Sequence, residues 1–269
     1  MKMYTKQELV IALKEVGLKK NDTVFVNTEL YKFGVLDGVK KKEDYFKIFF
    51  DAINEIISKG GTLATNSYSF QTLRYGEKFV YEKTKCSSGK FSEFIRSRGD
   101  SLRSDHPVFS VSAIGKNKKY ICSKNSLHNY GYGSPYHKFL KLNGKILNLA
   151  MEPCFNPLLH YAEFLVGVPY YYNKLTKLRY YKKGKKINKS FSSYVRYLNL
   201  DIKRNLNTFK KINHILRKNK IVKSTNLGSS KIHLIDSQKY LDVILDILYN
   251  DQFALVDNLT FLKNQIPNK

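Results

Sequence analysis

Apolar positions in the first third of the chain switch repeatedly between helical and strand spacing. Leu9, Leu13 and Val16 share one helical face, and a capping box of Thr5 and Glu8 marks where that helix begins. An apolar run at 23–26 then predicts a strand, residues 43–58 predict a second helix, and 62–64 predict a second strand. Short helices and strands therefore alternate from the start of the chain.

The same alternation continues to about residue 169. A polar, irregular stretch at 65–85 is expected to be a long loop. After it the sequence predicts helices at 88–98 (capped by Ser88), 134–142 (capped by Ser134) and 156–167 (opened by Asn156-Pro157), with strands at 108–114 and 145–150. Strands that alternate with helices at this spacing predict an α/β fold, in which helices cover both faces of a sheet.

The last hundred residues have a weaker pattern. Gly184 marks a hairpin tip at 182–186, and 200–219 reads as a helix. Strands are expected at 221–223 and 231–235, and Asp236 is placed to cap a final helix. No repeat or linker interrupts the chain, so we predict a single domain over residues 1–269.

Composition narrows the setting of the protein. The formal net charge is +25, which reflects a lysine-rich surface or a polyanionic partner. Three widely spaced cysteines without a CxxC pair argue against a disulfide framework. The sequence contains no run of about 18 apolar residues, so a membrane-spanning helix is not expected. We therefore expect a soluble cytoplasmic protein. His128, His137, His214 and His233 share no metal-ligand spacing, so no metal is expected.

One segment, from Cys154 to Glu163, carries candidate chemistry. With Asn156 as cap and Pro157 first in the helix, His160 is the fourth helical residue, and Glu163 lies on its face. The positive end of the helix dipole favours a neutral imidazole, and a neighbouring carboxylate can fix its tautomer. This arrangement suits a general base, although a structural His–Glu contact would have the same spacing.

Several stretches resemble the aminoglycoside 3-N-acetyltransferase family in order and spacing. The segment around His160 is similar to the family's NTxxHxxE motif. The resemblance extends over roughly residues 9 to 250 and includes the stretches 18–34, 88–91, 103–107, 110–115, 133–135, 142–147 and 168–170. The stretches 168–170 and 194–199 also look like a branch of the family from bacterial surface-polysaccharide clusters, which implies a role in lipopolysaccharide or capsule biosynthesis.

The resemblance implies a three-layer α/β/α sandwich with a mixed central sheet. It implies an acetyl-CoA-dependent N-acetyltransferase, with O-acetylation also compatible, in which the acceptor attacks the thioester directly. The implied catalytic residues are His160 and Glu163, and an acyl-enzyme on Cys154 is the alternative. The implied cofactor-binding residues are Asn27, Thr28, Glu29, Ser88 and Gly89, and the implied substrate-binding residues are Ser104 and His106. We expect backbone amides of 27–29 to stabilise the oxyanion.

Two departures from the family pattern concern the acceptor. Asn27-Thr28-Glu29 stands where the family usually has His-Ser-Ser, and Ala64-Thr65-Asn66 replaces Met-Pro-Thr. Residues 174–223 carry 17 Lys or Arg and one acid, Asp201, which should repel a polycationic aminoglycoside. We expect an anionic small-molecule sugar acceptor, either nucleotide-linked or on a phosphorylated lipid or surface glycan, with residues of about 170–269 contributing to its site.

Other functions fit the sequence as well. The chain could be an aminoglycoside 3-N-acetyltransferase that confers antibiotic resistance, or a family member without activity. A basic nucleic-acid-binding protein is the alternative from another class, because Tyr and Lys interleave between residues 170 and 186. No recognised nucleic-acid motif is present, so we expect no nucleic-acid partner. A homo-oligomer and weak association with a membrane surface are both compatible with the sequence.

Overall fold

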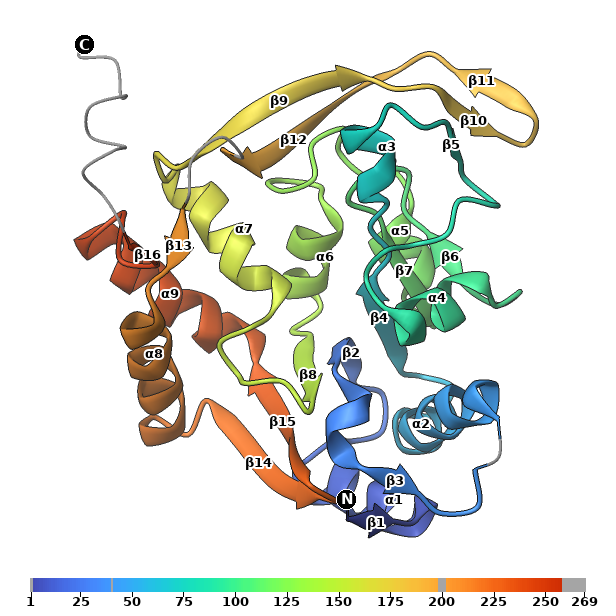
Figure 1. The fold of residues 1–269 in the computed structure, drawn as a ribbon, viewed down its shortest axis with the longest axis vertical. Coiled ribbons are helices and arrows are strands. Elements are labelled where there is room, and N and C mark those ends of the chain that lie inside the picture. The colour runs from blue at the N-terminus through green and yellow to red at the C-terminus, as the bar shows by residue number, and fades with distance from the viewer. Residues whose placement is uncertain (1, 40, 198–201, 258–269) are drawn as a thin grey trace.

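The computed structural model describes residues 2–39, 41–197 and 202–257, and a seven-stranded sheet forms its centre (Figure 1). The strand order is β14-β15-β8-β2-β4-β7-β6. The bounds are β2 (Thr23–Thr28), β4 (Thr62–Asn66), β6 (Leu102–Arg103), β7 (Val111–Gly115), β8 (Lys145–Leu149), β14 (Val222–Leu227) and β15 (Ser230–Asp236). β2 runs parallel to β4 and β8, and the other pairs are antiparallel, so the expected mixed sheet is confirmed.

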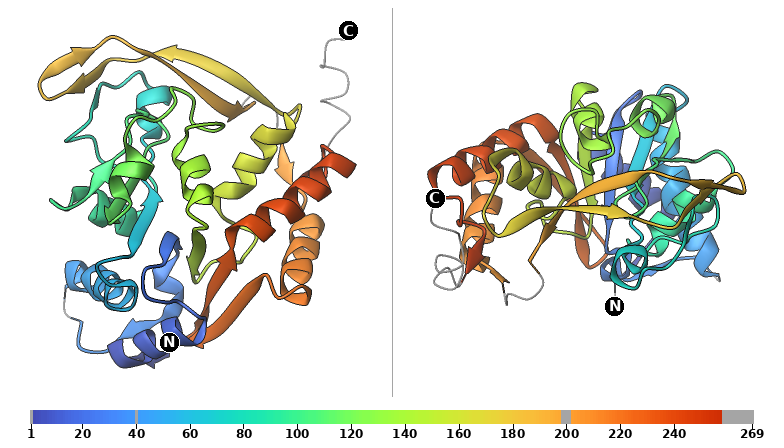
Figure 2. Two further views of the ribbon diagram at one scale, coloured as in Figure 1. Left: turned by 180° about the vertical axis from the view of Figure 1, so that it is seen from behind. Right: turned by 90° about the horizontal axis from the view of Figure 1, so that it is seen from above.

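Helices cover both faces of this sheet (Figure 2). Val24 and Val26 point into one buried cluster, whereas Phe25 points into the other, as alternate residues of a strand must. The first cluster contains side chains of α1 (Lys6–Glu15), α2 (Lys42–Ile57) and α4 (Lys90–Ser97). The second contains side chains of α5 (Lys118–Cys122), α6 (Pro135–Lys141), α7 (Pro157–Val166), α8 (Leu206–Lys218) and α9 (Ser237–Asn250). The expected three-layer α/β/α architecture is confirmed.

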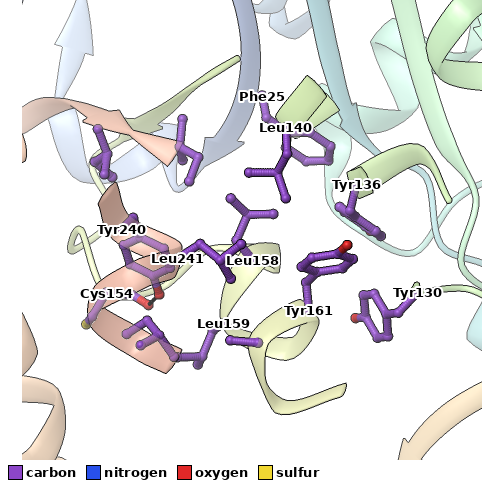
Figure 3. Close-up of a cluster of buried hydrophobic side chains, with 14 of the residues drawn as sticks. Phe25, Tyr130, Tyr136, Leu140, Cys154, Leu158, Leu159, Tyr161, Tyr240 and Leu241 are labelled. Carbon is purple, nitrogen blue, oxygen red and sulfur yellow. Dashed lines mark hydrogen bonds between the residues drawn. The ribbon is translucent and has the colours of Figure 1, made fainter. Parts of the chain in front are cut away.

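The second cluster holds α7 in place. Figure 3 shows Leu158 and Leu159 of α7 beside Tyr240 and Leu241 of α9, and all four side chains are buried. Full burial of a leucine side chain stabilises a fold by roughly 1.5–3 kcal/mol. The position of His160, which follows these two leucines, is therefore fixed by the core.

A long hairpin crosses one end of the molecule (Figures 1 and 2). Its strands are β9 (Tyr171–Lys177) and β12 (Ser190–Arg196), and its tip consists of β10 (Tyr180–Lys182) and β11 (Lys185–Ile187). The tip around Gly184 was expected from the sequence, but the two long strands were not. At the tip, β10 also pairs with β5 (Phe79–Val80), so part of the segment expected to be an irregular loop is a strand.

Other boundaries and elements also differ from expectation, among them the strand expected at 108–114, which is β7, and the one expected at 221–223, which is β14. Gly89, not Ser88, is the N-cap residue of α4. The 65–85 segment also contains α3 (Phe70–Arg74), and α8 begins at Leu206 rather than near residue 200. Leu198, Asn199 and Asp201, which entered the sequence argument, lie outside the described residues.

The predicted helix starts at Thr5, Ser134 and Asp236 are confirmed by side-chain hydrogen bonds to backbone amides. The remaining short elements are β1 (Met3–Tyr4), η1 (Leu30–Phe33), β3 (Val35–Leu36), β13 (Lys203–Arg204) and β16 (Val256–Asp257). In the described ranges, no helix is both long and apolar enough to cross a membrane.

Candidate active site

His160 lies in the first turns of α7, as the sequence predicted. Asn156 caps the helix by accepting a hydrogen bond from the Leu158 amide at 3.0 Å, and Pro157 is its first residue. The Asn156 side chain also donates to the Pro153 carbonyl at 3.1 Å, which fixes the loop before the helix. Both ends of this Asn are used, so the helix start, and with it His160, is rigidly placed.

A buried carboxylate orients the imidazole. His160 Nδ1 lies 2.6 Å from Glu163 Oε2, and the glutamate side chain is only 4% exposed. Tyr170 donates its hydroxyl to Glu163 Oε1 at 2.9 Å, and the Tyr171 hydroxyl lies 3.2 Å from His160 Nδ1. Because Nδ1 faces a carboxylate, it carries the hydrogen of a neutral ring, and Nε2 is left with its lone pair.

Two clefts meet at this imidazole. The first, which we call the loop cleft, has a volume of about 410 Å³ and lies beside the C-terminal ends of β2 and β4 and the start of α7. The second, the hairpin cleft, has a volume of about 430 Å³ and lies between β9, β12 and α3. Tyr68, His160 and Arg204 line both of them. Among the described residues, Nε2 of His160 has no protein partner, so it is available to ligands in either cleft.

Side-chain amides at the ends of two parallel strands line the loop cleft. Asn27 donates its Nδ2 to Asn148 Oδ1 at 2.9 Å, across the β2–β8 pair. Asn66 accepts a hydrogen bond on Oδ1 from the Tyr136 hydroxyl at 2.8 Å, and the Tyr68 hydroxyl lies 2.6 Å from that of Tyr136. This chain of contacts leaves Asn66 Nδ2 as the atom that can donate into the cleft.

The residues expected to bind the cofactor are only partly brought together. Asn27 and Glu29 line the loop cleft with His160, and Thr28 follows Asn27 at the end of β2. Ser88 accepts a hydrogen bond from the Tyr68 amide at 2.9 Å, and Gly89 opens α4 at a φ of 118°. Ser88 and Gly89 line neither cleft, so their role stays a prediction.

The expected oxyanion donors are not all free. The Glu29 amide donates to the Leu149 carbonyl at 2.9 Å, and the Glu29 carboxylate pairs with Lys32. The expectation that the 27–29 backbone supplies these donors is therefore wrong for Glu29, because the sheet already uses its amide.

Ser104 and His106 have internal hydrogen bonds and line neither cleft. The Ser104 hydroxyl accepts from the Val111 amide at 2.9 Å. His106 Nδ1 accepts from the Val108 and Phe109 amides, and Nε2 donates to the Ser192 carbonyl of β12 at 3.1 Å. Burial lowers the pKa of His106 to about 4, so the ring is neutral. These contacts join the 103–109 segment to the hairpin, and substrate binding by either residue stays a prediction.

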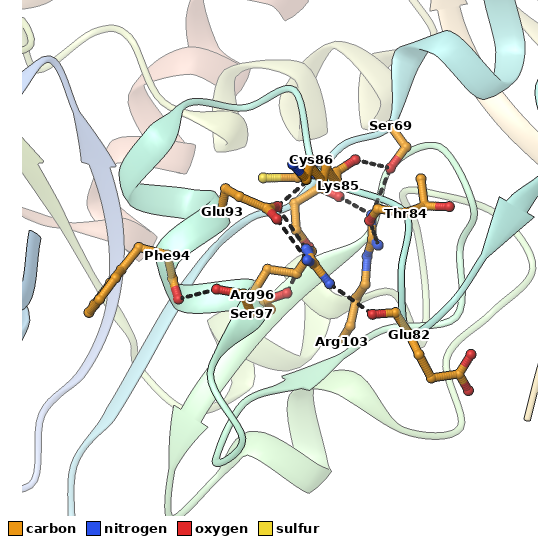
Figure 4. A network of polar contacts seen from close by, with 12 residues as sticks. Ser69, Glu82, Thr84, Lys85, Cys86, Glu93, Phe94, Arg96, Ser97 and Arg103 are labelled. Carbon is orange, nitrogen blue, oxygen red and sulfur yellow. Dashed lines mark hydrogen bonds and ion pairs between the residues drawn. The ribbon is translucent and has the colours of Figure 1, made fainter. Parts of the chain in front are cut away.

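Arg103, in the same 103–107 stretch, anchors the segment that carries Tyr68. It is buried and donates to the carbonyl groups of Ser67 and Thr84 and to the hydroxyl groups of Ser69 and Ser110, at 2.6–2.7 Å. Figure 4 shows this guanidinium beside the Glu93–Arg96 ion pair of α4. Burial lowers the pKa of Arg103 to about 10. Arg103 therefore supports the site by holding the 67–84 segment, which includes Tyr68.

Cys154 is poorly suited to nucleophilic catalysis. Its side chain is buried, and burial raises the pKa of the thiol to about 11. It borders neither the loop cleft nor the hairpin cleft. Within the described ranges, no group of three His, Cys, Asp or Glu residues is arranged to hold a metal ion.

The sequence did not single out the hairpin cleft. Four cationic side chains line it, namely Arg74, Lys174, Arg196 and Arg204, together with the aromatic residues Tyr68, Phe70, Phe109, Tyr130, Tyr171, Tyr172 and Tyr194. The only available signals were the excess of positive charge after residue 173 and the frequent tyrosines beside it. Neither signal shows which of these side chains meet.

Comparison with known proteins shows which family the chain resembles. The family model described as aminoglycoside 3-N-acetyltransferase matches residues 25–249. A Bacillus subtilis protein, the SPbeta prophage-derived aminoglycoside N(3')-acetyltransferase-like protein YokD, is 27% identical over 189 residues, which cover 62% of this chain and 66% of that protein. Aminoglycoside N(3)-acetyltransferase III of Salmonella sp is 23% identical over 181 residues, covering 62% and 63%.

A solved structure extends the likeness to nearly the whole chain. The structure titled AAC-IIIb binary with CoASH matches with a TM-score of 0.77 at 19% identity, covering 92% of this chain and 97% of that one. At this identity the match shows a shared fold. The curated relatives, in contrast, are matched over a little less than two thirds of their own length.

Proposed function

Because the chain belongs to the aminoglycoside 3-N-acetyltransferase family, we propose that it transfers an acetyl group from acetyl-CoA to an amino group of a sugar. One observation carries this proposal: a buried glutamate holds Nδ1 of His160 at 2.6 Å, while Nε2 has no partner among the described residues and the ring lines both clefts. A base between two binding sites can serve a reaction in which both substrates are present at once.

We assign the donor to the loop cleft, because Asn27 and Glu29, expected to bind the cofactor, line it with His160. His160 Nε2 takes the proton of the acceptor amine as its nitrogen attacks the thioester carbon. The new N–C bond forms, the C–S bond breaks, and the imidazolium returns the proton to the departing thiolate. Glu163 stabilises the transient imidazolium.

Asn66 is our candidate for the group that stabilises the oxyanion. Its Oδ1 is held by Tyr136, so Nδ2 is the donor that this side chain, which lines the loop cleft with His160, can offer to a ligand. A neutral donor held in place before the reaction stabilises negative charge that develops on the thioester oxygen. Asn66 takes the role expected of the Glu29 amide, which already donates to the Leu149 carbonyl.

Two classes of acceptor contain an amino sugar. The relatives are named for aminoglycosides, which favours an aminoglycoside acceptor. The charge of residues 174–223 favours a nucleotide-linked or surface-glycan sugar, with a role in lipopolysaccharide or capsule biosynthesis. For both classes we place the reaction in the cytoplasm, where acetyl-CoA is available.

A direct attack requires no acyl-enzyme on Cys154. The Cys154→Ala variant should therefore retain acetyl transfer.

The direct test replaces the base. His160→Asn should lower kcat roughly 100-fold or more, the usual scale for losing a general base, while the dissociation constant for CoA stays within about twofold. His214→Asn is the matched control, because His214 is exposed on α8. Transfer is followed by thiol release with a panel of amino sugars. An unchanged kcat in His160→Asn would refute the proposed mechanism.

A further inference from the structure

The hairpin cleft has a one-sided charge. Its lining includes Arg74, Lys174, Arg196 and Arg204 but no carboxylate among the described residues. The loop cleft differs, because Glu29 and Glu152 accompany its cations Lys32 and Arg204. A site for a polycationic aminoglycoside is expected to present carboxylates, since cations that face one another repel.

Among the described residues, these cations are not engaged in ion pairs. Across the described part of the chain, Lys174, Arg196 and Arg204 have no acidic side chain within ion-pair distance. The Arg204 guanidinium lies 5.3 Å from the ring centre of Phe155, and that of Arg74 lies 5.7 Å from the ring centre of Phe70. Aromatic contacts do not neutralise a positive charge, so with no carboxylate beside it in the described ranges an anionic ligand would gain from meeting it.

Two of the cations lie close to the reacting centre. Arg196 is directly opposite Tyr171 in the β9–β12 pair, and the Tyr171 hydroxyl contacts His160. Burial and the Glu163 carboxylate hold the pKa of Tyr171 well above its usual range, whereas Arg196 and Arg204 act in the opposite direction. Arg196 is therefore the cross-strand neighbour of the tyrosine that contacts the base.

Flat aromatic faces lie beside the same charges. Tyr171 stacks on Tyr194 with ring centres 4.9 Å apart and planes inclined by 17°. Tyr68, Phe70 and Phe109 form a second group, with ring centres 5.2–5.8 Å apart. Sugar rings and nucleobases both pack on aromatic faces, and phosphate oxygens pair with guanidinium groups.

We propose that the hairpin cleft binds an amino sugar that carries phosphate, with the phosphate held by Lys174, Arg196 and Arg204 and the amino group at His160. This inference rests on the proposed acetyl transfer and names the acceptor class for it. A sugar phosphate and a nucleotide-linked amino sugar share this chemistry, and they differ in whether a nucleobase can use the aromatic faces.

The experiment compares acceptors that differ in phosphate. Purified enzyme and acetyl-CoA are given glucosamine, glucosamine 1-phosphate, a uridine-diphosphate-linked amino sugar with a free amine, or kanamycin. We expect kcat/KM for the phosphorylated acceptors to exceed that for glucosamine and kanamycin by about tenfold or more. A further gain for the nucleotide-linked sugar would identify that source, and equal values would identify the sugar phosphate.

Charge reversal tests the location. Lys174→Glu, at an exposed position, should remove about tenfold of the preference for phosphate and leave the KM for acetyl-CoA unchanged. Arg196→Gln should act in the same direction. Lys185→Glu makes the same charge change on an exposed residue of β11 outside the cleft and serves as the control.

Each failure has a separate signature. Faster turnover of kanamycin or glucosamine than of the phosphorylated sugars, still dependent on His160, overturns this inference and leaves the acetyltransferase intact. A rise in the KM for acetyl-CoA in Lys174→Glu, with acceptor preference unchanged, also overturns it, because the donor would then occupy this cleft. Absence of acetyl transfer to every amine refutes the proposed function itself.

Discussion

The loop cleft and the hairpin cleft share His160 but are built differently. The loop cleft lies at the ends of sheet strands, where the side-chain amides of Asn27 and Asn66 are held by Asn148 and Tyr136. The hairpin cleft is lined by a two-stranded arm, and the arm's cations in the cleft, Lys174 and Arg196, have no ion-pair partner in the described part of the chain. The rigid edge of the sheet suits the attack on the thioester, which is the same for every acceptor. Residues of the surface arm can differ to suit another acceptor without disturbing His160.

The largest loss of activity should come from changing Glu163, which orients the base that both clefts share. Glu163→Gln keeps the shape of the side chain but removes the charge that orients His160 and stabilises its protonated form. We expect kcat to fall by about 50-fold for every acceptor, with the KM for acetyl-CoA unchanged. Initial rates of thiol release measure both constants.

Glu55→Gln, an exposed change on α2, is the matched control for this variant. A loss confined to one acceptor class would contradict the shared role of Glu163. So would a loss that appears only as a lower melting temperature.

A second prediction concerns two buried histidines outside the clefts, one that supports the hairpin and one in the sheet. His106 links the 103–109 segment to the hairpin, and His233 of β15 hydrogen-bonds to Ser224 in the sheet at 2.6 Å. Burial lowers the pKa of each to about 4, below the value near 6.5 of an unfolded chain. Both rings thus contribute stability that is present above pH 6.5 and is lost as the pH falls toward 4.

At pH 5 the loss should be about 2 kcal/mol for each ring in the free energy of unfolding. Urea unfolding at pH 7.5 and pH 5 tests this for the parent, His106→Gln and His233→Gln. Each variant should be less stable at pH 7.5 and should show a pH dependence smaller by that amount. Parallel pH profiles for all three proteins would show that these rings are not buried in the neutral form.

The smallest of these effects should come from Asn66 and should be confined to the loop cleft. Asn66→Ala removes the donor assigned to the thioester oxygen, and we expect kcat to fall about tenfold with little change in the KM of the acceptor. Asn226→Ala, exposed on β14, is the control. A change in acceptor preference, with kcat unaltered, would instead assign Asn66 to acceptor binding.

The part of the site that could be predicted from sequence depends on local rules. Asn156, Pro157 and the three-residue spacing of His160 and Glu163 define a capped helix and one of its faces, and the structure has both. The same local rules placed the capped starts at Thr5 and Asp236. A local rule also failed once, at Ser88, because its hydroxyl is engaged by the distant Tyr68 amide rather than by its own helix.

The rest of the site depends on contacts between distant segments. β9 and β12 lack a clear alternation, and tertiary contacts such as His128 to Asn173 and His106 to Ser192 hold them. The orientation of Asn66 depends on Tyr136, which lies 70 residues away. No spacing rule reaches that far, so the hairpin cleft and the amide donor could be found only in the folded chain.

The central claim is that one imidazole takes the acceptor's proton at the point where the two clefts meet. A crystal structure with CoA and an unreactive phosphorylated sugar bound together tests it most directly. We predict the CoA sulfur in the loop cleft and the sugar in the hairpin cleft, with the atom in place of the acceptor nitrogen about 3 Å from His160 Nε2. A complex that places both the sulfur and the sugar away from His160 would contradict the account.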